Sequence, residues 1–329
     1  MLRLDSSMFR ESAKSHASKK LSNLLLSFIA VFLVIYLAEA IIPGIISSKP
    51  LNEALTEMGY YDKDKNLSFK QSMKISEEIS VKPHVMIPYL FCTVFGTLIS
   101  IGYCHYFELR KVSSMGVRKR RAGLHYASGL IIGILMMALI VLLSAVTGTV
   151  SVKTADDVNI GLITLYLLGF LVQGMSEEFI FRGYFMTTLG ANHSPYLAIG
   201  ISSAAFSLFH AANPGISPIA LLNLFLFGVF AAVYMIHTNN IWGVCAIHSM
   251  WNFSQGNLFG ISVSGSGNIE SLLVTSSKSS NSLLTGGKFG IEGSIFTTVA
   301  LAAAIAAVLI LQKRREAQQS GTAAPTAGK

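Results

Sequence analysis

Charged side chains are scarce in this sequence. Only 13% of its 329 residues are Asp, Glu, Lys or Arg, whereas 52% are hydrophobic and the mean hydropathy is +0.55. This composition excludes an ordinary soluble protein, which needs a charged surface. The net charge of +8 comes from short basic blocks beside apolar segments, a pattern typical of membrane topology signals. We therefore expect membrane lipid as a partner, and no nucleic acid.

Cysteines and metal-binding motifs are also rare. The three cysteines lie inside or at the ends of apolar segments without metal-type spacing, which is typical of small packing residues. No His-Glu-x-x-His motif places two zinc ligands and a base on one helix. Internal repeats, which mark many transporters, are missing as well.

Long apolar runs make up most of the chain. Windows of about 20 residues, the length that crosses a bilayer, predict an all-α polytopic membrane protein with about eight transmembrane helices. The predicted spans are 21–46, 86–107, 126–150, 160–189, 196–212, 217–236, 240–259 and 293–311.

Three basic blocks indicate the orientation of these spans. They lie in residues 1–20, 110–121 and 313–315. With an even number of spans all three fall on one side, and Lys- and Arg-rich segments face the cytoplasm. We expect a multi-pass protein of the cell membrane with cytoplasmic N- and C-termini.

Ionisable and amide groups interrupt three of the predicted spans. At 1.5 Å per residue they lie roughly 13–20 Å from the cytoplasmic ends of their spans, so they reach a similar depth. Buried charges at such depth are costly and commonly functional. We expect them to converge on one water-containing cavity open toward the cytoplasm. The residues are Glu177, Glu178, Arg182, His210, His248 and Asn252.

Spacing within these clusters indicates separate roles. Glu178 and Arg182 are four residues apart on one helix, in the order that favours an ion pair. Glu177 points about 100° away and is left to act as a general base. His248 and Asn252 share a helix face, and both can donate hydrogen bonds to a developing oxyanion.

Each of these residues alone also has a structural interpretation. The acids and Arg182 could form a buried ion-pair network, and His210 or Asn252 could hydrogen-bond between helices. Asn223, in the sixth span, could support the site from a neighbouring helix. Glu39 fits a position at the outer interface. The joint arrangement favours a functional site.

The three clusters together resemble a known family. The motifs are Glu177-Glu178-x-x-x-Arg182, Phe206-x-x-x-His210 and His248-x-x-x-Asn252, each in its own apolar span. In this order they resemble the CPBP family of intramembrane proteases, which includes the CAAX proteases and the Abi proteins and is related to type II CAAX prenyl endopeptidases. The resemblance covers residues 160–260.

The resemblance implies an intramembrane endopeptidase with four catalytic residues. Glu177 with His210 would activate the attacking water. His248 with Asn252 would stabilise the oxyanion, and the Glu178–Arg182 pair would support the site. The implied substrate is a membrane-associated peptide or a lipidated, CAAX-like protein. The sequence does not define the oligomeric state.

Cofactor and function each keep an alternative. We expect no cofactor, although the family is often described as metalloproteases. Zinc or another divalent metal would be held by Glu177, His210 and His248. The other functions are a non-proteolytic scaffold of the same family, acting in immunity or regulation, and a proton-coupled transporter.

These predictions divide the chain into six parts. The catalytic core comprises the fourth to seventh helices, and the Ser/Gly-rich loop is expected to be flexible. In order, the parts are a basic cytoplasmic N-terminus (1–20), three helices (21–158) with an outside loop (47–85), the catalytic core (159–260), the Ser/Gly-rich loop (261–292), a last helix (293–312) and a cytoplasmic tail (313–329).

Overall fold

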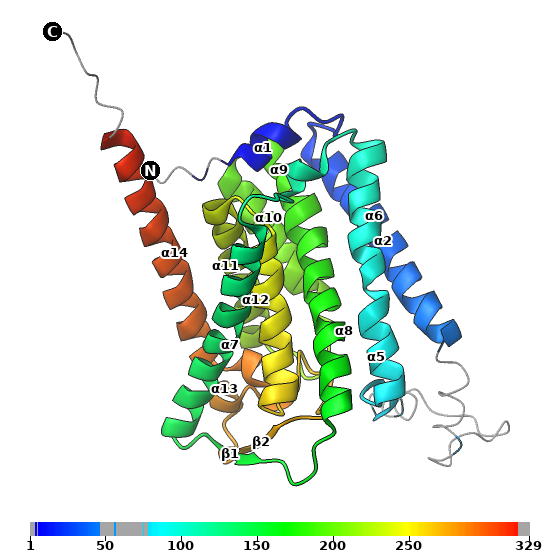
Figure 1. The fold of residues 1–329 in the computed structure, drawn as a ribbon, viewed down its shortest axis with the longest axis vertical. Coiled ribbons are helices and arrows are strands. Elements are labelled where there is room, and N and C mark those ends of the chain that lie inside the picture. Colours follow the sequence, from blue (N-terminus) through cyan, green and yellow to red (C-terminus); the bar gives the residue numbers. More distant parts are fainter. Residues whose placement is uncertain (1–3, 5, 47–55, 57–74, 76–77, 322–329) are drawn as a thin grey trace.

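The protein is a bundle of long helices with a small sheet at one end (Figure 1). The structure is a computed structural model that describes residues 4, 6–46, 56, 75 and 78–321. Most of the predicted outside loop, 47–85, therefore lies outside the described residues. The helical architecture agrees with the predicted polytopic all-α protein.

Long apolar segments form the main α-helices of the bundle, and shorter helices connect or extend them. Their bounds are α1 (Ser7–Ser12), α2 (Leu21–Ile46), α5 (Pro83–Cys92), α6 (Val94–Gly102), α7 (Ala122–Val146), α8 (Ile160–Glu178), α9 (Thr187–Asn192), α10 (Pro195–Phe209), α11 (Pro218–Thr238), α12 (Trp242–Phe253), α13 (Ser282–Thr285) and α14 (Ile295–Gly321). Wider π-helical turns follow α6, α8 and α12. They are η1 (Tyr103–Phe107), η3 (Phe179–Met186) and η4 (Ser254–Leu258), whereas η2 (Val112–Met115), η5 (Gly287–Phe289) and η6 (Ile291–Gly293) are 3₁₀ turns.

Six helical stretches of the described chain are long and apolar enough to cross a membrane. The predicted spans at 196–212 and 240–259 correspond to the shorter helices α10 and α12, so eight spans are not confirmed. Helix α10 ends early because Pro214 and Gly215 follow it, and Gly215 has a positive φ of 73°. Helix α12 passes into η4 after Phe253.

The sheet corrects two predictions. Strand β1 (Val150–Thr154) pairs antiparallel with β2 (Leu273–Ser277), with Val150 opposite Ser277. The third helix therefore ends at Val146, and the residues expected at its end begin a strand. The Ser/Gly-rich loop, expected to be flexible, instead contains β2 and α13. Alternating Val150 and Val152 with polar residues suits a half-buried strand better than a helix.

Glycines let the central helices approach closely. Gly129 and Gly133 of α7 face the backbone of α12, and Gly174 of α8 faces Ser249 of α12. A Cβ at any of these three positions would overlap the facing backbone. Small residues spaced in this way allow close helix contact. Helix α12 is thereby held between α7 and α8, which brings His248 beside the glutamates of α8.

Candidate active site

Glu178 lies in a closed ion-pair cluster. Its Oε1 atom accepts a hydrogen bond from Arg182 Nη1 at 3.0 Å and lies 2.8 Å from His248 Nδ1. The side chains of Glu178 and Arg182 are fully buried. The Arg182 guanidinium also lies 4.5 Å from the centre of the Phe206 ring, a cation–π distance. The predicted pairing of Glu178 with Arg182 is confirmed.

Glu177 turns away from this cluster toward two imidazoles. Its Oε2 atom lies 3.9 Å from His210 Nε2 and 3.7 Å from His248 Nε2. Among the described residues this oxygen has no hydrogen-bond partner. The structure therefore brings together the three predicted groups from α8, α12 and the end of α10.

Hydrogen bonds define which ring nitrogens are available. His210 Nδ1 lies 2.8 Å from the carbonyl oxygen of Phe206, which can only accept. Nδ1 therefore donates, and the lone pair of neutral His210 is on Nε2. His248 Nδ1 faces the Glu178 carboxylate in the same way. The Nε2 atom of each ring, which carries the lone pair of the neutral imidazole, thus faces Glu177 Oε2.

Gln173 connects Glu177 to Asn252, and it was not among the predicted site residues. Its Nε2 donates to Glu177 Oε1, and its Oε1 accepts a hydrogen bond of 2.8 Å from Asn252 Nδ2. Gln173 lies four residues before Glu177 on α8, so the two share a helix face. That spacing was the signal that could have identified it.

A cavity of about 550 Å³ surrounds these groups. Its size is within the range of ligand-binding pockets. Aromatic rings form much of its wall, and the described wall contains no Lys or Arg. Three carboxylates line it: Glu39, Glu177 and Glu292.

Glu39 occupies a different position from the one expected. It lies on the cavity wall with Tyr36 and Tyr89, not at an outer interface. Its Oε1 packs close to the Cα of Gly96, where a Cβ would lie 3.0 Å from that oxygen. A larger residue at position 96 would displace the Glu39 carboxylate.

Asn223 supports the cavity through the backbone of the opposite loop. Its Nδ2 donates to the carbonyl oxygens of Glu292 and Ser294, at 2.6 and 2.8 Å. The Glu292 carboxylate accepts from Trp251 Nε1 at 3.2 Å and from the Ser264 amide at 2.7 Å. These bonds hold the segment before α14 against α11 and α12.

The donor set fits a metal in kind. Two imidazole nitrogens and a carboxylate oxygen are ligands that zinc accepts, and here they would be His210, His248 and Glu177. The described residues contain no group of three His, Cys, Asp or Glu side chains already arranged to hold an ion. A metal would require these side chains to move closer together.

The fold and these contacts define a class of protein. Helices long enough to cross a membrane enclose a glutamate–histidine cluster in a cavity of about 550 Å³, as an intramembrane hydrolase requires. Residues 159–254 match the family model of type II CAAX prenyl endopeptidases, described as Rce1-like. This match supports the resemblance of the segment to the CAAX-type intramembrane proteases. No curated protein matches the chain in a sequence comparison.

Proposed function

We propose that the protein is an intramembrane endopeptidase that hydrolyses a peptide bond with water activated by Glu177. The observation that supports this most is the unpaired Glu177 Oε2, which faces two imidazole Nε2 atoms inside the cavity. Glu177 Oε2 and the Nε2 lone pair of neutral His210 are two acceptors that face the same space, and one water molecule can donate a hydrogen to each. Such a water would lie within reach of a base.

The proposed reaction proceeds through a tetrahedral intermediate. Glu177, assisted by His210, accepts a proton from water as the water oxygen attacks the carbonyl carbon. Glu177 then passes this proton to the amide nitrogen as the C–N bond breaks. The products are a carboxylic acid and an amine, so one water is consumed.

His248 and Asn252 are proposed to stabilise the oxyanion. His248 is proposed to donate from Nε2 to the oxyanion while its Nδ1 donates to the Glu178 carboxylate, which fixes the orientation of the ring. Asn252 Nδ2 has a second hydrogen beyond the one given to Gln173. Donors fixed before the reaction stabilise the developing charge most strongly.

The proposed substrate is a membrane-associated or lipidated peptide. Aromatic residues of the cavity, including Phe32, Phe170 and Phe209, suit apolar groups. Because no described Lys or Arg lines the wall, a substrate carboxylate would find no basic partner there. The wall therefore suits apolar or lipidated segments better than charged ones.

The proposed mechanism uses no cofactor. If the enzyme does use a divalent metal, Glu177, His210 and His248 would hold it, and the ion would polarise the substrate carbonyl and the bound water. A chelator distinguishes the two cases, because only the metal-dependent enzyme loses activity.

Cleavage of quenched peptides by the detergent-purified protein tests this proposal. A farnesylated CAAX-type peptide and an unlipidated peptide are compared, each with and without chelator. We expect the wild-type protein to cleave peptide both with and without the chelator, and we expect no cleavage by Glu177→Gln. The exposed Asp156→Asn variant, an equivalent carboxylate-to-amide change, should keep full activity. Equal cleavage by Glu177→Gln would refute the mechanism, and loss with chelator would establish the metal-dependent alternative.

A further inference from the structure

The cavity lies toward one end of the bundle. Helix α1, α9 and the C-terminal part of α14 lie at one end, and β1, β2 and α13 lie at the other (Figure 1). Loop residues of the cavity wall come from the second end, namely Ser80, Ala212, Asn213, Pro214, Ser264, Gly265 and Ser266. None of the wall residues belongs to α1, α9 or η2. The expectation of a cavity open on the same side as the termini therefore disagrees with its described wall.

Aromatic side chains pack against the cavity wall on the side that faces the end with α1. Phe28 of α2 stacks on Phe185 with ring centres 3.8 Å apart, and Phe32 contacts Phe209 at the same distance. Phe28 and Phe185 are 3% and 2% exposed. The Phe28 ring also lies 5.8 Å from Phe181 and 5.9 Å from Phe209, both in the cavity wall, so the buried Phe28–Phe185 pair packs directly behind that wall, two residues before α9 begins.

Charge distinguishes the two ends. The described residues near α1 and α9 include dense basic segments at 118–121 and 313–315. At the opposite end, Lys153 and Lys278 are scattered among acids such as Asp156 and Asp157. Basic segments remain on the cytoplasmic side. The end with the cavity loops is therefore the non-cytoplasmic one.

We propose that the substrate reaches the site from the non-cytoplasmic face of the membrane. Its class is then a polypeptide exposed on that face, such as the outer segment of a membrane-tethered protein, and not a cytoplasmic lipidated tail. The inference deepens the proposed function and rests on it, because the protein has a peptide substrate only if it is the proposed peptidase. The direction of access is a property of the fold and is measurable without cleavage.

Single cysteines report the direction of access. Ala212→Cys places a thiol on an exposed, cavity-lining residue, and Lys119→Cys places one on the exposed basic segment. The native Cys92, Cys104 and Cys245 are buried. Right-side-out vesicles are treated with a membrane-impermeant maleimide before and after permeabilisation. We expect Ala212→Cys to be labelled in sealed vesicles and Lys119→Cys only after permeabilisation.

The other outcomes overturn the proposal. Labelling of Ala212→Cys only after permeabilisation would place the cavity on the cytoplasmic side. No labelling in either state would mean that the cavity is closed at this end. If wild-type protein cleaves no peptide while Ala212→Cys is labelled from outside, the proposed function fails and the direction of access remains supported.

A second measurement connects access with turnover. Purified Ala212→Cys is modified with a bulky charged maleimide, and modified Lys119→Cys serves as the control. We expect cleavage by modified Ala212→Cys to fall at least tenfold, with the control unchanged. Undiminished cleavage after complete modification of Ala212→Cys would show that substrate enters elsewhere.

Discussion

Glu177 and Glu178 are neighbours in the sequence, but their carboxylates have different surroundings. Glu178 is fully buried and shares one oxygen between Arg182 and His248. Glu177 is 22% exposed and faces the cavity with an unpaired oxygen. The roughly 100° between successive helical residues separates the two side chains. One carboxylate is thereby suited to hold the site together and the other to react.

Gln173 should act as a positioning residue. Gln173→Leu removes both its bond to Glu177 and its bond from Asn252. We expect kcat to fall by roughly 10- to 100-fold, because a misplacement of about 1 Å in a catalytic group costs that much. KM should change little. The exposed Thr164→Val on the same helix is the control, and an unchanged kcat in Gln173→Leu would contradict this role.

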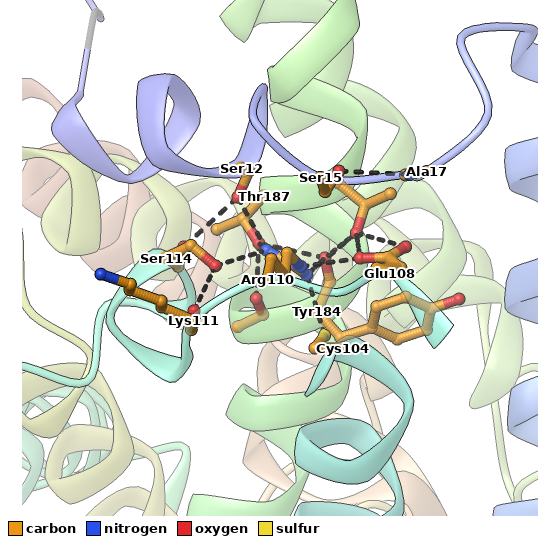
Figure 2. Close-up of polar contacts among 12 residues, drawn as sticks. Ser12, Ser15, Ala17, Cys104, Glu108, Arg110, Lys111, Ser114, Tyr184 and Thr187 are labelled. Carbon is orange, nitrogen blue, oxygen red and sulfur yellow. Dashed lines mark hydrogen bonds and ion pairs between the residues drawn. The ribbon is translucent and has the colours of Figure 1, made fainter. Parts of the chain in front are cut away.

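Among the elements, those at the end that carries α1 are joined by one buried arginine. Arg110 was expected to be a surface topology signal, but only 3% of it is exposed. Its guanidinium donates to Ser12 of α1 at 2.7 Å, to Thr187 of α9 at 2.8 Å and pairs with Glu108 at 2.7 Å (Figure 2). Burial raises the pKa of Glu108, and Arg110 opposes that shift. Arg110 thus connects α1 to the segment that follows Glu177 and Glu178.

Arg110→Met should destabilise the fold. It leaves Glu108 buried without its cation, a change that typically costs about 3–5 kcal/mol. The melting temperature in detergent should fall clearly, whereas Lys111→Met, at an exposed neighbour, should leave it unchanged. Adding Glu108→Gln to Arg110→Met should restore part of the loss. An unaltered melting temperature in Arg110→Met would show that the network does not stabilise the bundle.

The stability that α1 contributes to the fold should depend on pH through Glu11. Burial raises the pKa of the Glu11 carboxyl, but hydrogen bonds from Arg118 and Ser113 lower it by more. The net pKa is therefore below the ordinary value of 4.5. A lowered folded pKa means that the carboxylate stabilises the fold above pH 4.5 and loses this effect as pH falls through the folded value. The melting-temperature difference between wild type and Glu11→Gln should therefore shrink on acidification. A constant difference from pH 6 to pH 3 would contradict this contribution.

For the whole molecule, the sequence predicted the long helices and the main polar cluster, and it did so for physical reasons. Apolar runs of bilayer length have few alternatives to helices, and the i, i+4 spacing of Glu178 and Arg182 permits their ion pair. The end of α10 was placed three residues too late, because Ala211 and Ala212 extend the apolar run past Phe209, where the helix stops. The helix that begins with α12 continues through η4 to Leu258, close to the predicted end at 259.

Gln173 was not identified although it lies four residues before Glu177, because its second partner, Asn252, comes from another helix. Glu39 was placed at the outer interface, because sequence spacing carries no record of which helices line a cavity.

The central claim is that Glu177 performs chemistry while Glu178 maintains the structure around it. Measuring turnover and melting temperature together for Glu177→Gln and Glu178→Gln tests this directly. We predict that Glu177→Gln loses roughly 100- to 10,000-fold in turnover, the usual contribution of a general base, with a wild-type melting temperature. Glu178→Gln should melt at a lower temperature, because Arg182 loses its charged partner. Full turnover by Glu177→Gln would contradict the account.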